Sequence, residues 1–304
     1  MRFSGSQYEI AAGPARVTIV EVGGGLRSYT VGGTEILDGY SADEICPGSA
    51  GQILIPWPNR IRDGRYAFGG GDHQLALSEA PAHNAIHDLI RWLRWDAVER
   101  TESSVTVECN LVAQPGYPWP LRMRTTWSLS EAGLTADHAV TNEGDQPCPF
   151  GIGAHPYLHV DVPVDDVVLT MPATSRLLTD GRGLPIGAAK VTGSVFDYTE
   201  GKRIGTTKLD TAFGDVIRDA DGRSTVRLAR PDGSAIAEVW SDRAFGWWQV
   251  YTGDTLPEER RRRSVAVEPM SCPPDAFRSG RDVISIAPGD TWTGTWGIRP
   301  GAAA

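Results

Sequence analysis

The chain has 304 residues, of which 40% are hydrophobic, and a formal net charge of -9 at pH 7 with a pI near 5.2. This acidic balance argues against nucleic acid and anionic membrane surfaces as partners, because both require a basic counterpart on the protein. No apolar run approaches the roughly 18 residues of a membrane helix, and the first residues lack the apolar region of a secretory signal. The four cysteines form no CxxC pair and no zinc spacing, so we expect reduced thiols and a cytoplasmic protein.

Short strands separated by turns are predicted for most of the chain. The 35 glycines and 21 prolines divide it into brief segments, which favours strands. Residues 15–37 place β-branched runs between glycine turns and predict a β-meander. Residues 103–141 alternate apolar and polar positions, which indicates antiparallel strands with one buried face. Because no stretch requires a long helix and no linker interrupts the pattern, we predict one all-β domain over residues 1–300, with a tail at 301–304.

The segment GIGAHPYLH holds His155 on a constrained backbone near the middle of the chain. Pro156 disfavours helical backbone at the residue before it, so His155 is expected to be extended. The small residues that precede it leave room for close approach to the backbone. Histidine has an unperturbed pKa near physiological pH, which suits it to proton transfer. On this evidence alone, a structural histidine is the more common outcome.

Two polar groups occur in the first third of the chain. Asn59 and Arg60 follow a Pro-Trp-Pro segment, which predicts an irregular, well-packed loop because proline removes the donors of a strand ladder. His83 and His87 are four residues apart, a spacing that on a helix would suit a metal. No third ligand follows, so we predict no metal and an extended loop that delivers His87 into a cleft.

Two carboxylates in the second half of the chain are candidates for a site. Asp210 lies in KLDTAFGDV, where by itself a turn or capping aspartate is the simpler interpretation. Glu268 lies within the otherwise apolar strand SVAVEPM. Burying an unpaired carboxylate is costly, so a glutamate at this position is expected to have a function.

The order of these segments resembles the aldose 1-epimerase (galactose mutarotase) family. The HPY of His155 and the VEPM of Glu268, just over a hundred residues apart, carry most of the resemblance, which covers nearly the whole chain. The NRI segment of Arg60, the NAIHD segment of His87 and the KLDTAF segment of Asp210 corroborate it. The resemblance implies a β-supersandwich, mostly antiparallel, that interconverts sugar anomers without a cofactor. The WWQVYTGD strand and the DAF after VEPM look closest to the bacterial branch that contains sulfoquinovose mutarotases.

The resemblance also implies a role for each matching residue. The histidine of HPY is the family's general acid and the glutamate is its general base, which places these roles on His155 and Glu268. Arg60, His87 and Asp210 match the residues that bind sugar hydroxyls. The chain departs from the family after His87, where Asp88 replaces the usual glycine and puts the path of that loop in question. A monosaccharide is the expected partner, with the protein a monomer or homodimer.

Other residues are expected to contribute to sugar binding. Asn59 supplies an amide for hydroxyls, and Trp247 or, as our preferred residue, Trp248 could stack on the face of a sugar. A sulfonate would require a cationic pocket, for which Arg60, Arg91, Arg94 and the run Arg260–Arg263 are candidates. Ordinary surface arginines with no role in binding would explain these residues equally well.

Mutarotation asks for an acid and a base on opposite oxygens of one sugar. The anomeric O1–H loses a proton while the ring oxygen gains one, and the ring recloses by the reverse transfers. We therefore expect His155 and Glu268 to lie within about 10 Å of each other. A hexose-6-phosphate 1-epimerase uses the same chemistry and stays open, as does a non-catalytic carbohydrate-binding protein. A glycoside hydrolase would need two carboxylates, whereas the strongest pair here is His plus Glu.

Overall fold

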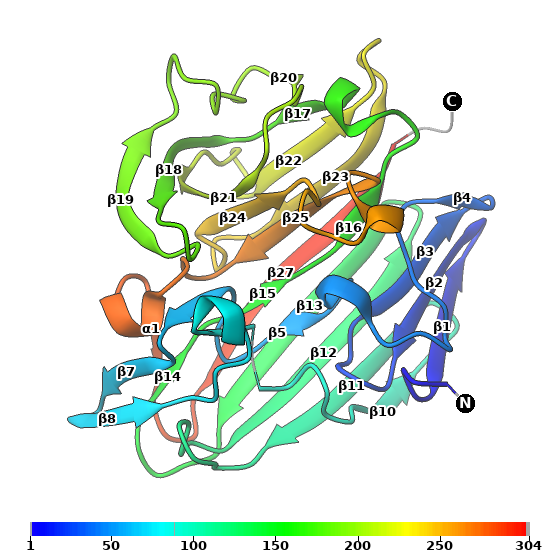
Figure 1. Ribbon diagram of the computed structural model, residues 1–304. Helices are drawn as coiled ribbons and strands as arrows, with labels where there is room; N and C mark the ends of the chain where they lie inside the picture. The colour runs from blue at the N-terminus through cyan, green and yellow to red at the C-terminus, as the bar shows by residue number, and fades with distance from the viewer. Residues whose placement is uncertain (1, 88, 302–304) are drawn as a thin grey trace.

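The computed structural model describes residues 2–87 and 89–301, which form antiparallel sheets (Figure 1). The larger sheet has nine strands, in the spatial order β10 (Asp96–Arg100), β11 (Ser104–Leu111), β12 (Leu121–Ser130), β13 (Gly133–Asn142), β27 (Thr291–Pro300), β23 (Ala235–Ser241), β22 (Ser224–Ala229), β17 (Val168–Thr170) and β20 (Lys202–Arg203). The second sheet has eight, in the order β19 (Pro185–Lys190), β18 (Ala173–Thr179), β21 (Asp210–Val216), β24 (Trp247–Tyr251), β25 (Ser264–Met270), β15 (Gly153–Ala154) and β5 (Ile53–Leu54), with β16 (Tyr157–His159) also paired to β25.

Smaller elements surround these two sheets. A four-stranded meander, at the right of Figure 1, consists of β1 (Gln7–Ala12), β2 (Ala15–Val20), β3 (Leu26–Val31) and β4 (Thr34–Glu35). Three two-stranded ladders pair β6 (Arg60–Arg62) with β9 (Asn84–Ile86), β7 (Arg65–Phe68) with β8 (Gly71–Gln74), and β14 (Cys148–Phe150) with β26 (Ile284–Ile286). The helical turns are α1 (Ala276–Ser279), η1 (Pro47–Ser49), η2 (Ala80–Ala82), η3 (Val164–Asp166) and η4 (Glu258–Arg260).

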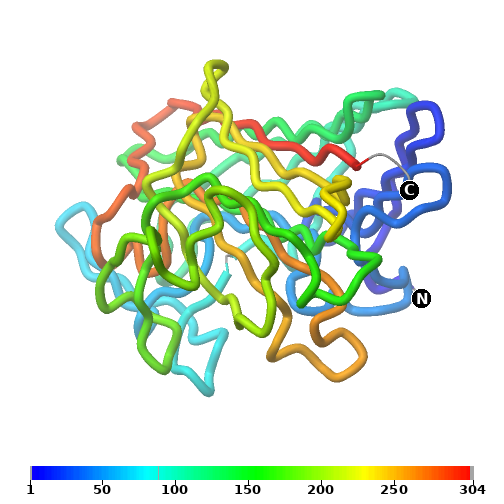
Figure 2. The backbone as a smooth tube through the Cα atoms, turned by 90° about the horizontal axis from the view of Figure 1, so that it is seen from above, coloured from blue at the N-terminus to red at the C-terminus, as the bar shows by residue number. Residues whose placement is uncertain are grey.

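The two large sheets pack face to face through one hydrophobic core. Along β12, residues alternate between buried and partly exposed, so that Met123 and Trp127 face inward, as the period of a half-buried strand requires. From the eight-stranded sheet, Trp248 and Val267 enter the same cluster. Strands distant in sequence complete the larger sheet: β23 pairs with β27, and Figure 2 shows the yellow and red segments side by side.

The structure agrees with the expected fold class. The meander at residues 15–37 and the antiparallel strands at 103–141 are both present, and α1, the α-helix of the described residues, has four residues. One local expectation was wrong: Arg60 begins the short ladder β6–β9 rather than lying in an irregular loop. The four cysteines are free thiols. Within the described ranges, no helix is long and apolar enough to cross a membrane.

Candidate active site

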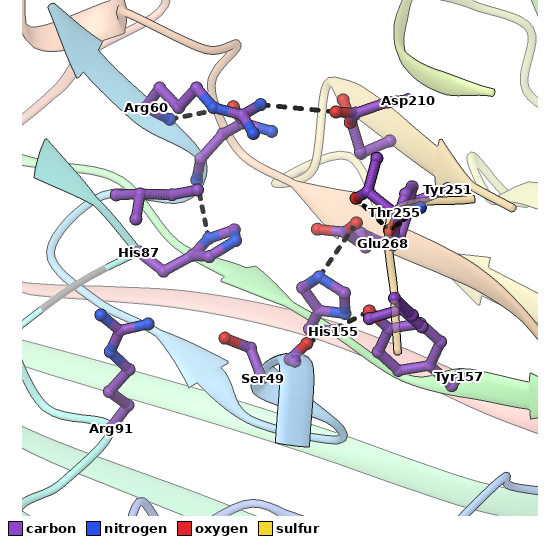
Figure 3. A pocket seen from close by; sticks show the side chains of 15 residues that line it. Ser49, Arg60, His87, Arg91, His155, Tyr157, Asp210, Tyr251, Thr255 and Glu268 are labelled. Atoms are coloured by element: carbon purple, nitrogen blue, oxygen red, sulfur yellow. Dashed lines mark hydrogen bonds and ion pairs between the residues drawn. The ribbon is translucent and has the colours of Figure 1, made fainter. Parts of the chain in front are cut away.

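A pocket of about 240 Å³ opens above the outer face of the eight-stranded sheet (Figure 3). This volume suits a single small molecule rather than a long chain of sugars. Six of the seven residues expected to form the site line it, namely Asn59, Arg60, His87, His155, Asp210 and Glu268. His155, Asp210 and Glu268 meet because β15, β21 and β25 share one sheet, and the other three residues lie in or next to the separate β6–β9 ladder.

His155 and Glu268 are in direct contact at the base of this pocket. The His155 Nε2 atom lies 3.4 Å from Glu268 Oε1, and the two side chains are 6% and 2% exposed. Glu268 belongs to the fully buried strand β25, while His155 lies between β15 and β16 and is held by backbone hydrogen bonds to residues 51 and 52. Two atoms of the pair, His155 Nδ1 and Glu268 Oε2, have no hydrogen-bond partner among the described residues. These groups are therefore placed to exchange protons with a bound molecule.

Burial sets the protonation of the pair. Removal from water lowers the pKa of His155 to about 4 and raises the pKa of Glu268 well above its ordinary value, with the negative charge of Asp210 adding to the second shift. Burial therefore favours the neutral form of both groups, a neutral imidazole beside a protonated carboxyl. That form carries one proton, the same number as an imidazolium beside a carboxylate.

Arg60 and Asp210 form a second group on the pocket wall. Arg60 Nη1 lies 3.5 Å from Asp210 Oδ2, and the Nε and Nη2 atoms of the same guanidinium donate to Glu79 at 3.0–3.2 Å. Burial lowers the pKa of Arg60, but the hydrogen bonds that it donates to Glu79 and Asp210, and the negative charges of these groups, outweigh burial and raise the pKa overall. Arg60 is thus a fixed cation with two anionic neighbours.

His87 and Asn59 hold each other in unusual backbone conformations. Both have positive φ, 45° for His87 and 59° for Asn59, a region that side-chain-bearing residues seldom occupy away from functional sites. The His87 amide donates to Asn59 O at 3.0 Å, and the Asn59 amide donates to His87 Nδ1 at 3.2 Å. Burial, with His155 nearby, lowers the pKa of His87 well below its ordinary value. The neutral ring accepts at Nδ1, so its Nε2–H is the donor that remains.

Gln249 is a pocket residue that our sequence analysis missed. It lies opposite Glu268 in the register of β24 and β25, and its Nε2 donates to Asp210 Oδ1 at 2.5 Å. Its Oε1 is buried without a partner among the described residues. The signal was available, because Gln249 is an amide within the apolar strand WWQVY, just as Glu268 is a carboxylate within SVAVEPM.

Trp248 does not serve as the expected stacking platform. Neighbouring residues of a strand face opposite sides of the sheet, so if Gln249 faces the pocket, Trp248 must face the core. Its side chain is fully buried in the main cluster and its indole donates to Ser224 Oγ at 3.0 Å. The expectation that Trp248 binds sugar in this pocket was therefore wrong.

The run Arg260–Arg263 also does not form a cationic pocket. Arg260 pairs with Glu44, Arg262 with Asp165 and Asp254, and Arg263 with Asp38, while Arg261 donates to a backbone carbonyl. Outside this run, the exposed Arg94 pairs with Glu21 and Asp96. Of the arginines considered for a sulfonate, Arg60 and Arg91 line the pocket.

The chemistry of the pocket is that of proton transfer and hydroxyl binding. In residues 2–87 and 89–301, no group of three or more His, Cys, Asp or Glu side chains could hold a metal ion. His83, considered as a partner for His87, instead contacts Asp63 at 2.9 Å on the surface. The pocket offers an acid–base pair at its base, and donors and acceptors on its walls.

Comparison with known proteins identifies the class to which this fold and site belong. The sequence model of the aldose 1-epimerase family matches residues 6–299. A relative, the uncharacterized protein YihR of Escherichia coli K12, is 35% identical over 291 residues, covering 95% of this chain and 91% of YihR. The galactose mutarotase of Mus musculus is 23% identical over 260 residues, covering 81% and 73%. The chain therefore belongs to the aldose 1-epimerase family of isomerases.

Solved structures show the same fold. The GalM/aldose epimerase homologue from C. elegans aligns with a TM-score of 0.83 at 18% identity, covering 97% of this chain and 99% of that one. The galactose 1-epimerase from Lactobacillus acidophilus NCFM aligns with a TM-score of 0.77 at 20% identity, covering 95% and 92%. At this level of identity the likeness concerns the fold, and the nearly all-β, antiparallel architecture is shared.

Proposed function

We propose that this protein interconverts the α and β anomers of an aldohexose, or of a modified hexose such as sulfoquinovose, by acid–base ring opening. The observation that carries the proposal is the buried contact of His155 Nε2 with Glu268 Oε1 at 3.4 Å, in a pocket lined by hydroxyl-binding groups. The expected separation of less than about 10 Å between these two groups is met.

In the proposed reaction, Glu268 takes the proton of the anomeric O1–H while His155 gives a proton to the ring oxygen. The C1–O5 bond breaks, an open-chain aldehyde forms, and rotation about C1–C2 presents the other face of the carbonyl. Reclosure reverses both transfers. The pair begins and ends with one proton, which moves from Glu268 to His155 before ring opening, because bound hydroxyls that donate to Glu268 favour its carboxylate form.

The wall residues position the sugar in this proposal. Asp210 and Gln249 Oε1 accept from hydroxyls, and the Nε2–H of His87 donates to one. Arg60 donates through its Nη1 edge, and Asn59 acts mainly by holding His87. Because these donors and acceptors surround the acid–base pair, the sugar is held with its anomeric carbon near both groups, which makes the reaction effectively intramolecular.

Two arginines bear on the choice of sugar. Arg60 is already neutralised by Glu79 and Asp210, so it suits a neutral hydroxyl better than a second anion. Arg91 lies on the other side of His87 from Arg60 in Figure 3. A sulfonate or phosphate at C6 could contact Arg91, so sulfoquinovose and, as the second candidate, a hexose 6-phosphate belong among the candidate substrates together with the neutral aldohexoses.

Anomeric exchange NMR with a panel of sugars tests the proposal. The panel contains galactose, glucose, glucose 6-phosphate and sulfoquinovose, each compared with the rate without protein. Glu268→Gln keeps the shape of the side chain but removes the base, so the exchange rate should fall by about 10²–10⁴-fold. Full exchange in this variant would refute the mechanism, and no acceleration for any sugar would refute the function.

A further inference from the structure

The guanidinium of Arg60 is held from behind by a carboxylate that does not line the pocket. Glu79 accepts from Arg60 Nε at 3.0 Å and from Nη2 at 3.0 Å, which is the side-on, two-bond geometry of a strong ion pair. Both side chains are largely buried, at 17% and 24% exposed. Burial raises the pKa of Glu79, but the hydrogen bonds from Arg60 and Asn84 outweigh it and leave the pKa lowered, so the group is ionised.

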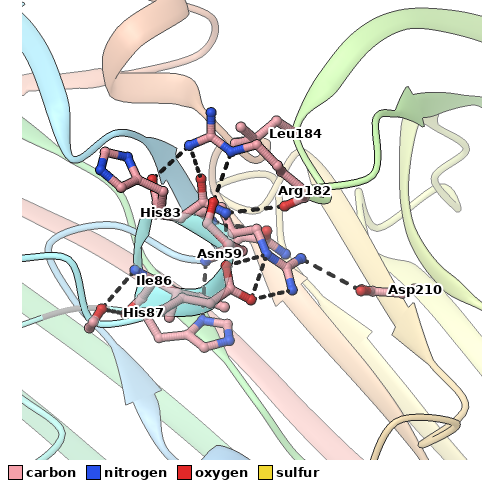
Figure 4. A network of polar contacts seen from close by, with 12 residues as sticks. Asn59, His83, Ile86, His87, Arg182, Leu184 and Asp210 are labelled. Carbon is pink, nitrogen blue, oxygen red and sulfur yellow. Dashed lines mark hydrogen bonds and ion pairs between the residues drawn. The ribbon is translucent and has the colours of Figure 1, made fainter.

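Glu79 is in turn held by a network that ends on a distant hairpin (Figure 4). The fully buried Asn84 donates to Glu79 Oε2 at 2.8 Å and to the carbonyl of Arg182 at 3.1 Å. Arg182, in the turn between β18 and β19, donates to Asn84 Oδ1, and to the carbonyls of Ala82 and His83. Hydrogen bonds therefore connect the loop that carries Glu79 to this turn at several positions.

The same turn packs directly against Arg60. Gly183 has a φ of +73°, and a Cβ atom on it would lie 2.7 Å from Arg60 Nη1 and 2.9 Å from Cζ. Only a residue without a side chain fits against the guanidinium at this distance. Glu79 thus binds the Nε and Nη2 atoms of the guanidinium, and Gly183 packs against the group. The Nη1 atom is left directed at Asp210 and the pocket.

We propose that Glu79 is a positioning residue of the sugar site, and that the β18–β19 turn, through Arg182 and Gly183, completes a clamp on Arg60. The proposal rests on the proposed function. In this arrangement, the orientation of the Arg60 guanidinium is fixed and its charge is balanced before a sugar binds. Sugar binding then requires little further loss of conformational entropy from the arginine side chain.

A double-mutant cycle tests whether Glu79 acts through Arg60. Glu79→Gln should lower kcat/KM by about 10–100-fold, mainly through KM, because a misplaced binding group weakens the positioning of substrate. Arg60→Ala should lower it by at least as much. In the Arg60→Ala background, Glu79→Gln should have no further effect beyond about twofold, since coupled residues are not additive. Multiplicative losses would overturn the proposal, because a merely structural role is independent of Arg60.

The turn is tested by variants on a single hairpin. Gly183→Ala removes no charged group and should raise KM by displacing Arg60, and Arg182→Ala should do the same by loosening the Glu79 loop. Ile186→Ala, at an exposed position of β19, is the matched control and should leave KM unchanged. If Glu79→Gln does not fold, Gly183→Ala carries the test, and an unchanged KM in both turn variants refutes the clamp.

Binding separates this inference from the proposed function. The dissociation constant of a 1,5-anhydro sugar, which has no anomeric hydroxyl, is measured across the same cycle. If the wild-type protein bound this sugar but accelerated no exchange, the proposed function would fail while the cycle still reported on Glu79. Equal dissociation constants in wild type and Glu79→Gln would overturn the clamp, whatever the catalytic result.

Discussion

Acid should inactivate the enzyme only below about pH 4, because the pKa of His155 is lowered to about that value by burial. The reasoning follows the proton count of the catalytic pair. With one proton, the pair has both a donor and an acceptor. When His155 becomes an imidazolium while Glu268 is still protonated, the pair holds two protons and has no base for the anomeric hydroxyl. The value of kcat/KM should then fall tenfold per pH unit, since it reports the ionisation of the free enzyme.

The size of the effect at pH 5 distinguishes a buried from an ordinary histidine. With a pKa of about 4, about 90% of the pair keeps its active proton count at pH 5. With the unperturbed histidine pKa of about 6.5, about 3% would keep it, a difference of about thirtyfold. Such a ratio lies well outside the error of a rate measurement.

The assay follows anomeric exchange of glucose from pH 3.5 to 8, with the protein-free rate subtracted at every pH. Glucose has no group that ionises in this range, so the profile belongs to the protein. Far-UV circular dichroism at each pH is the control for acid unfolding. An acid limb centred near pH 6.5 in folded protein would refute the lowered pKa of His155.

Three other measurements test what the structure assigns to buried groups. Burial lowers the pKa of His138 to about 3, so this histidine should contribute a drop of about 1.4 kcal/mol per pH unit to the free energy of unfolding as pH falls below 6.5, and His138→Asn should reduce the measured slope by that amount in urea titrations. Trp248→Phe should lose about 1 kcal/mol of stability with the Ser224 hydrogen bond while KM stays constant; a raised KM contradicts its placement in the core. Arg263→Ala should destabilise by about 1–3 kcal/mol, because Asp38 is buried, and an altered kcat/KM would contradict a purely structural role.

Local patterns predicted the strands but not their partners. The alternation in residues 103–141 yielded β11, β12 and β13, since each residue's exposure follows from its own position in a half-buried strand. The pairing of β13 with β27, more than 140 residues later, has no local signal. The same holds for the ladder that receives Arg60, which needs β9 beside it.

Within the site, motif matching named six residues that the fold brings together in one pocket. It failed where orientation decides, as with Trp248, because the choice between two adjacent residues depends on which face of β24 lies over Glu268. It also failed for residues that act through others. Glu79 carries no motif of its own, and its contact with Arg60 joins side chains that lie 19 residues apart in the sequence.

The unsatisfied atoms of the pocket explain why the hydroxyl groups of a sugar should fit it. His155 Nδ1, Gln249 Oε1 and Glu268 Oε2 are buried without partners among the described residues. Leaving a buried polar atom unpaired costs about 1–3 kcal/mol, so a ligand that supplies the missing bonds recovers that free energy on binding. Hydroxyl groups can donate or accept as each atom requires. In the proposed mechanism, the hydrogen bonds that a bound sugar makes to His155 and Glu268 both hold the sugar and set the protonation of the pair.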